Sequence, residues 1–277
     1  MITSVSNSKV KRIVTLQEKS RVRVKENVFI VEGIKMFEEA PIERMRELYI
    51  EEMLYEEVQA DGDGLKEKID ACQTAGISIE TVSKEVFAKM SDTQSPQGIL
   101  CVMERYAYDC EEMIGKAKHK QAEDGKAPLF LVLEDIQDPG NLGTMIRTAE
   151  GAGVDGVIMS RGTVDIYNPK TIRSTMGSLY RMPFYVAEDL TGVIRLLQAC
   201  QITVYAAHLQ GKKYYHEIDY KEGAAFLIGN EGNGLKKETA DLADCYLKIP
   251  MEGKLESLNA AVAAALLMYQ AANCNRD

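Results

Sequence analysis

Five polar side chains in the second half of the chain are of types that can bind and orient a ligand. They are Asn141, Arg147, Glu231, Ser257 and Asn259. Each lies near the end of an apolar run that predicts a strand, and open α/β sheets bind ligands at the C-terminal ends of their strands. Taken singly, the two asparagines and Ser257 could be helix caps, and Glu231 could lie at a helix N-terminus, where the helix dipole favours a negative charge. Their position on one predicted sheet edge favours a functional site.

A second observation supports the assignment of Arg147 to this site. It follows Asn141 by six residues on a helix face that is otherwise apolar. An unpaired cation would be costly there. We therefore expect an ion pair between Arg147 and Glu231.

Three familiar nucleotide-binding and catalytic patterns do not fit this chain. Residues 151–156 match Gly-x-Gly-x-x-Gly, but a predicted helix precedes them and a strand follows, the reverse of the order a dinucleotide site needs. A Gly-x-Ser-x-Gly elbow and a Gly-x-x-x-x-Gly-Lys-Ser/Thr loop are both missing from the sequence. His208 ends a predicted strand and could line a site, although such a residue is more often a plain strand-end residue.

The composition is that of a globular protein of 277 residues, 45% apolar and 27% charged. No apolar run approaches the roughly 18 residues that span a bilayer. The six cysteines are scattered, without Cys-x-x-Cys pairs or histidines at ligand spacing. We therefore expect no metal site, no disulfide framework, no membrane association and a cytoplasmic location.

The charge of the chain is acidic overall but basic at its start. The formal net charge is −9, which argues against nonspecific coating of nucleic acid. Residues 1–25 nevertheless hold seven basic residues against the single acid Glu18. A solvated helix face and a phosphate-contacting surface both explain this imbalance. On the second interpretation, Lys9, Lys11 and Arg12 are candidates for contacts to nucleic-acid phosphates.

Strands and helices alternate through both halves of the chain. The first half predicts strands at 27–33, 48–50, 77–82 and 97–103, with helices at 9–19, 34–40 and 83–90. The second half predicts strands at 129–133, 156–159, 184–186, 202–207, 224–228 and 246–250, with helices at 141–150, 169–180, 190–199 and 260–271. This pattern indicates an α/β protein with a mainly parallel sheet in its second half. The alanine-rich helix after Asn259 is apolar all round, so we expect it to be fully buried.

The sequence resembles the SpoU (TrmH-type) RNA ribose methyltransferases of the SPOUT superfamily in three motifs, which occur in the family's order. They are residues 141–147, residues 227–235, and Ile249-Pro250-Met251 with residues 257–263. Residues 168–177 also look like the segment that this family carries between its motifs. The first half, with Phe29-Ile30-Val31-Glu32-Gly33 and Gln97-Gly98-Ile99, is similar to the ribosomal-protein-like RNA-binding domain of many members.

The resemblance implies a domain arrangement, a cofactor and a reaction. Residues 1–105 would bind RNA, residues 106–127 would be a linker, and residues 128–277 would form a trefoil-knotted methyltransferase domain. S-adenosylmethionine would be held by loops that carry Gly229, Ile249 and Leu258, and the protein would be a homodimer. The reaction would methylate a ribose 2′-hydroxyl, with Arg147 positioning the substrate phosphate and hydroxyl, and Glu231, Asn141, Ser257 and Asn259 orienting Arg147 and the ribose. Lys170 and Arg173 are candidates for contacts to the RNA backbone.

Three alternatives remain open from the sequence. The substrate could be rRNA or tRNA, and the N-terminal domain favours rRNA, of the 23S type. The protein could instead be an RNA-binding or ribosome-assembly factor that keeps the fold without catalysis. A small-molecule α/β enzyme would show no RNA affinity.

Overall fold

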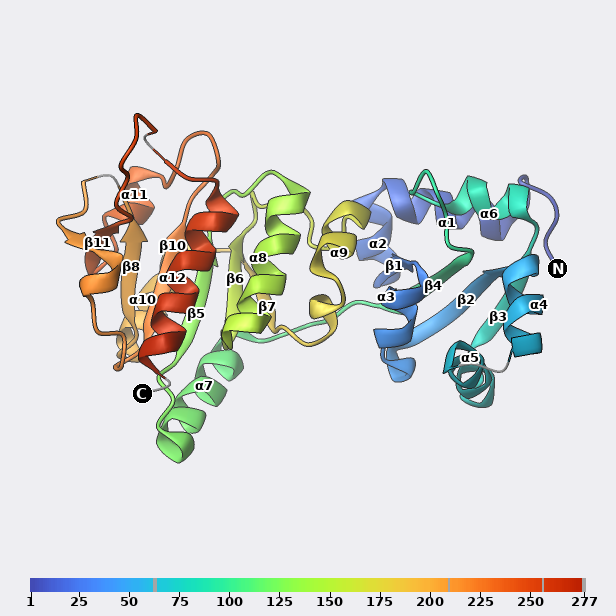
Figure 1. The fold of residues 1–277 in the computed structure, drawn as a ribbon, viewed down its shortest axis with the longest axis horizontal. Coiled ribbons are helices and arrows are strands. Elements are labelled where there is room, and N and C mark those ends of the chain that lie inside the picture. Colours follow the sequence, from blue (N-terminus) through green and yellow to red (C-terminus); the bar gives the residue numbers. More distant parts are fainter. Residues whose placement is uncertain (62–63, 209, 256, 276–277) are drawn as a thin grey trace. The chain divides into compact units, whose positions relative to one another are not determined.

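The computed structural model describes residues 1–61, 64–208, 210–255 and 257–275 (Figure 1). The chain divides into two compact units. The smaller unit holds residues 1–106 and 165–180, and the larger unit holds residues 107–164 and 181–277. None of the helices described is long and apolar enough to cross a membrane.

The smaller unit is built on a four-stranded sheet with the order β1-β4-β2-β3. Its strands are β1 (Val28–Glu32), β2 (Met45–Glu51), β3 (Ser78–Val82) and β4 (Ile99–Glu104). β4 is antiparallel to β1 and β2, whereas β2 and β3 are parallel. The helices are α1 (Ser8–Glu18), α2 (Ser20–Glu26), α3 (Ile34–Glu39), α4 (Glu52–Asp61), α5 (Gly64–Thr74), α6 (Lys84–Met90) and α9 (Pro169–Thr175).

The larger unit is built on a seven-stranded sheet with the order β7-β6-β5-β10-β8-β11-β9. The strands are β5 (Leu129–Leu133), β6 (Gly156–Ser160), β7 (Phe184–Ala187), β8 (Thr203–Ala207), β9 (Lys213–Tyr214), β10 (Ala224–Ile228) and β11 (Cys245–Lys248). Every neighbouring pair is parallel. The helices are α7 (Cys110–Asp124), α8 (Pro139–Ala152), α10 (Leu190–Ala199), α11 (Lys237–Ala240) and α12 (Ala260–Cys274). The predicted α/β class and parallel sheet are confirmed.

The central strands of this sheet are continuous apolar runs because helices cover both of their faces. All five residues of β5, β6 and β10 are buried. β5 and β10 lie side by side in register, so the loops that follow Leu133 and Ile228 emerge next to each other. The larger unit thereby brings together two of the three motif segments.

The compact units differ from the predicted domains in two places. The predicted linker, residues 106–127, contains α7, whose buried Cys110, Met113 and Ile114 join the core of the larger unit. Residues 165–180 belong to the smaller unit although they follow β6 in the chain. There Asp165 accepts a hydrogen bond of 2.6 Å from the buried Arg23.

Two helix predictions need correction. The predicted helix over 169–180 ends at Thr175, because Met176 and Gly177 take left-handed φ values of 49° and 92°. α12 is not fully buried, since Val262 is 49% exposed and Tyr269 is 41% exposed. One side of this apolar helix therefore faces solvent in the single chain.

Candidate functional site

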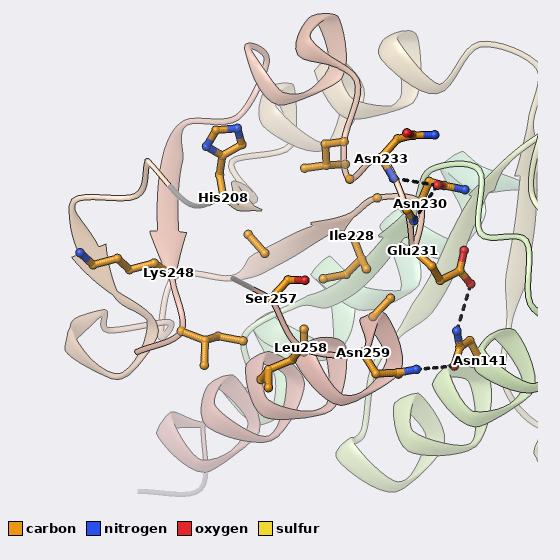
Figure 2. Close-up of a pocket in the computed structure, with 18 of the residues that line it drawn as sticks. Asn141, His208, Ile228, Asn230, Glu231, Asn233, Lys248, Ser257, Leu258 and Asn259 are labelled. Atoms are coloured by element: carbon orange, nitrogen blue, oxygen red, sulfur yellow. Dashed lines mark hydrogen bonds between the residues drawn. The ribbon is translucent and has the colours of Figure 1, made fainter. Parts of the chain in front are cut away.

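A cavity of about 910 Å³ lies at the C-terminal ends of the parallel strands in the larger unit (Figure 2). Its walls come from the segments after β5, β8, β10 and β11 and from the residues that open α12. The lining residues are Gln137, Asp138, Asn141, Ala207, His208, residues 228–235, Leu247, Lys248, Ile249, Met251, residues 257–260 and Ala263. This is the sheet edge that the sequence predicts.

Three predicted site residues form one chain of side-chain hydrogen bonds along the cavity wall. The amide nitrogen of Asn259 donates to the amide oxygen of Asn141 at 3.0 Å. The amide nitrogen of Asn141 donates in turn to Glu231 Oε1, also at 3.0 Å. Figure 2 shows these three side chains pointing toward one another from α8, α12 and the segment after β10. Each amide is therefore oriented, and each keeps one N–H for a further acceptor.

The ends of this chain are tied to the backbone. Asn259 caps α12, because its amide oxygen accepts from Ala261 N at 2.8 Å. Glu231 accepts from the backbone N–H groups of Gln137 at 3.0 Å and Asp138 at 3.1 Å. Burial alone would raise the pKa of Glu231, but the hydrogen bonds from Gln137 and Asn141 outweigh it, and the pKa lies below its usual 4.5. Glu231 is thus an ionised acceptor that fixes Asn141, and a poor general base.

The glycine-rich turn, residues 229–236, closes on itself through its backbone and requires glycine at Gly229. Asn230 and Gly234 exchange backbone hydrogen bonds of 3.1 and 2.9 Å. A Cβ atom on Gly229 would lie 2.2 Å from the carbonyl carbon of Gly234. The side chain of Asn230 supports the turn from inside, accepting from Gly232 N at 2.9 Å and Asn233 N at 3.0 Å. At Gly229, which has no side chain, the cavity wall is therefore backbone.

The remaining predicted residues of this unit fall into two groups. Gly229, Ile249 and Leu258, predicted to bind the cofactor, all line the cavity, as does Ser257. Arg147 does not line it. Its side chain is exposed on α8, and neither a hydrogen bond nor an ion pair joins it to another described residue. The predicted ion pair between Arg147 and Glu231 is wrong, because backbone donors and Asn141 occupy the carboxylate.

The sequence interpretation missed or undervalued several cavity residues. Gln137 and Lys248 carry no local motif that marks them. His208 does line the cavity, and its ring packs against Tyr246 with 4.8 Å between ring centroids. Its place after an apolar strand was the available signal. Within the described residues, no group of three side chains of the kind that binds metals comes together.

The predicted RNA-contacting residues all lie in the smaller unit, where most have partners. Lys9 pairs with Glu80, and Arg12 pairs with Glu26 at 2.7 Å and with Glu47 at 2.8 Å. Lys11 is exposed and bonds to no other described residue through its side chain. On α9, Arg173 pairs with Asp92 at 2.8 Å, and Lys170 stands at the start of the helix that Asn168 caps.

Comparison with known proteins decides the family. A profile of the SpoU rRNA Methylase family matches residues 128–269, more than half of the chain. The chain belongs to this family. It is therefore an RNA methyltransferase, and the resemblance of its three motifs is confirmed. A profile of the MRM3-like substrate binding domain matches residues 7–101.

Proteins that match nearly the whole chain support the same assignment. The 23S rRNA (guanosine(2553)-2′-O)-methyltransferase RlmP of Bacillus subtilis is 35% identical over 97% of each chain. The crystal structure of an rRNA methyltransferase from Sinorhizobium meliloti, solved with S-adenosylmethionine bound, is 29% identical, with a TM-score of 0.80 over 98% of this chain and 97% of the other. AviRb from Streptomyces viridochromogenes shares the fold, with a TM-score of 0.82 at 23% identity over 98% of each chain.

Proposed function

We propose that this chain transfers a methyl group from S-adenosylmethionine to a ribose 2′-hydroxyl of 23S rRNA. The observation that carries the proposal is the hydrogen-bonded chain Asn259–Asn141–Glu231 on the wall of the large cavity of a SpoU-family protein. Its two amides present free N–H groups beside the cavity, where they can bind ribose or phosphate oxygens.

The cavity fits S-adenosylmethionine. The backbone wall at Gly229 leaves hydrogen-bonding groups open to an adenine or a methionine, while Ile249 and Leu258 offer apolar surface. A cavity of this size lies within the usual range for such ligands. When bound, S-adenosylmethionine supplies an activated methyl group.

The protein's own residues have to orient the nucleophile and manage its proton. A ribose hydroxyl is a weak nucleophile and loses its proton as the new bond forms. Glu231 holds Asn141 in place. The hydrogen bonds that Glu231 accepts lower its pKa, so it is a poor base for this proton. Arg147, with no partner among the described residues, has its whole guanidinium available for a substrate phosphate. Ser257, exposed in the cavity, adds a hydroxyl for the ribose.

Support for rRNA as the substrate comes from the smaller unit and from the relatives. The unit carries the substrate-binding profile, and the Bacillus subtilis relative is named for guanosine 2553 of 23S rRNA. Lys9, Lys11, Arg12, Lys170 and Arg173 are the proposed contacts to the RNA backbone. tRNA is the alternative substrate, because other relatives carry tRNA/rRNA names.

A homodimer in the cytoplasm is part of the proposal. The exposed Val262 and Tyr269 on α12 form an apolar face beside α8, the helix that carries Arg147. Covering this face with a second copy would bury it and shield Arg147 from solvent. The trefoil knot implied by the family stays a prediction.

The test is methyl transfer from labelled S-adenosylmethionine to total RNA from cells that lack this protein. We expect one labelled ribose in 23S rRNA, and the equivalent of guanosine 2553 is the first position to map. A labelled tRNA would support the proposed reaction but show that the substrate is tRNA. No transfer and no binding of S-adenosylmethionine would favour a non-catalytic RNA-binding factor.

A further inference from the structure

Both ends of the glycine-rich turn are bonded to the two residues that directly follow β5: the start to Asp135, and the end to both Glu134 and Asp135. At the start of the turn, the side-chain nitrogen of Asn230 donates to the backbone oxygen of Asp135 at 2.9 Å. At its end, Lys236 bonds to both acidic side chains. We call Glu134 and Asp135 the acidic clamp.

Glu134 is buried, with 4% of its surface exposed, at a position where a carboxylate is costly unless it is fully hydrogen-bonded. Its two oxygens have separate donors. Lys236 N donates to Oε2 at 2.8 Å, and the hydroxyl of the buried Thr239 donates to Oε1. Glu134 thereby fixes the backbone at the point where the turn leads into α11.

Asp135 binds the side chain of Lys236, whereas Glu134 binds its backbone N–H. The Lys236 ammonium lies 2.7 Å from Asp135 Oδ2, and this contact, with a hydrogen bond from Ser160, lowers the pKa of Asp135. Ser160 Oγ donates to Oδ1 at 2.7 Å and accepts from Asp135 N at 2.9 Å. A Cβ on Gly162 would lie 2.1 Å from Oδ1, so only glycine leaves room for this carboxylate.

The residues between the two fastened ends form a wall of the cavity and include Glu231 (Figure 2). Neither Asp135 nor Lys236 lines the cavity. We propose that the acidic clamp and Lys236 are positioning residues, which set the glycine-rich turn for cofactor binding and hold Glu231 at Asn141. This inference rests on the proposed function only for the identity of the cofactor.

The experiment compares Lys236→Met and Asp135→Asn with wild type. Binding of S-adenosylmethionine is measured by calorimetry, kcat and KM by methyl transfer, and amide hydrogen exchange over residues 229–236 without any ligand. We expect each variant to lose about threefold to fivefold in cofactor affinity, the scale of a partly exposed ion pair. The double variant should lose no more than either single one, because both remove the same contact. Exchange in the turn should quicken, with an unchanged melting temperature.

Lys237→Met is the matched control, since Lys237 is the next residue and pairs with Asp241 outside the cavity. It should leave affinity, kcat and exchange in the turn unchanged. Glu134→Ala should lose more than tenfold in affinity, because it leaves the buried Thr239 hydroxyl and the backbone N–H of Lys236 without their acceptor. Glu134→Gln should recover most of that loss, since its amide can still accept from Lys236 N and donate to Thr239.

The outcomes separate the two proposals. If Lys236→Met has the same affinity, kcat and hydrogen exchange as wild type, the positioning role is overturned and the proposed function stands. A wild-type protein that does not bind S-adenosylmethionine would overturn the proposed function. The exchange measurement would still decide whether the acidic clamp orders the turn.

Discussion

The side-chain amide of Asn141 donates to the carboxylate of Glu231 at 3.0 Å, although 90 positions separate them in the sequence. Because Asn141 also accepts from Asn259, both halves of its amide are assigned, and its remaining N–H has a fixed direction. The contact joins the first family motif to the second. It explains why the site needs an amide at 141 and a carboxylate at 231.

Replacing Asn141 with aspartate tests this relationship. Asn141→Asp sets a second carboxylate beside Glu231 and removes the donor, so the two side chains repel. We expect methyl transfer to fall about a hundredfold, the scale for loss of one pre-organised donor. Single-turnover rates on RNA measure it. Thr144→Ala, on the exposed face of the same helix, is the control. Equal rates for Asn141→Asp and the control would remove the amide from the mechanism.

Arg147 should separate catalysis from cofactor binding. It lies outside the cavity and has no partner among the described residues, so Arg147→Ala leaves the cavity wall intact. We expect methyl transfer to be abolished and affinity for S-adenosylmethionine to stay within about twofold, because a bidentate phosphate contact is lost and no cofactor contact is. Calorimetry and the transfer assay on the same preparation measure both. Arg147→Lys should recover little activity. Equal loss of binding and transfer would contradict the assigned role.

The sheet edge and most of the cavity residues could be predicted from the sequence because their signals are local. The buried strands are continuous apolar runs, and Asn259 precedes a helix in the form of an N-cap. Strand ends in a parallel sheet converge, so Asn141, Glu231 and Asn259 could be placed together without coordinates.

The hydrogen-bond partners of Glu231 could not be predicted from the sequence, nor could the packing of residues 165–180 in the smaller unit. Glu231 accepts from the backbone of Gln137 and Asp138, and a backbone N–H has no sequence signature. The contact that holds Asp165 in the smaller unit spans 142 positions to Arg23. A local pattern shows that a segment forms a helix, but the surface on which it packs depends on the whole fold.

The pH dependence of stability should report on Glu231. Its pKa in the folded protein lies below 4.5, held there by backbone and Asn141 donors. A lowered carboxyl pKa stabilises the fold above the unfolded value, and the stabilisation is lost as the pH falls through the folded value. Glu231→Gln removes this contribution. We expect the melting temperatures of wild type and variant to differ most above about pH 5 and to converge in more acidic buffer. Thermal unfolding across the pH range measures it, and a difference that grows in acid would show the opposite sign.

The basic residues of α1 should contribute unequally to RNA binding. Lys9 and Arg12 already pair with Glu80, Glu26 and Glu47, whereas the exposed Lys11 has no described partner. A free lysine releases counterions when it meets a phosphate, so Lys11→Glu should weaken RNA binding and lower the salt slope by about one. Filter binding on 23S rRNA fragments at several salt concentrations measures this slope. Lys116→Glu, on α7, reverses a charge that already pairs with Glu112 and serves as the control. If the slopes of Lys11→Glu and wild type coincide, α1 does not contact the RNA backbone at this residue, and the basic start of the chain is a solvated helix face.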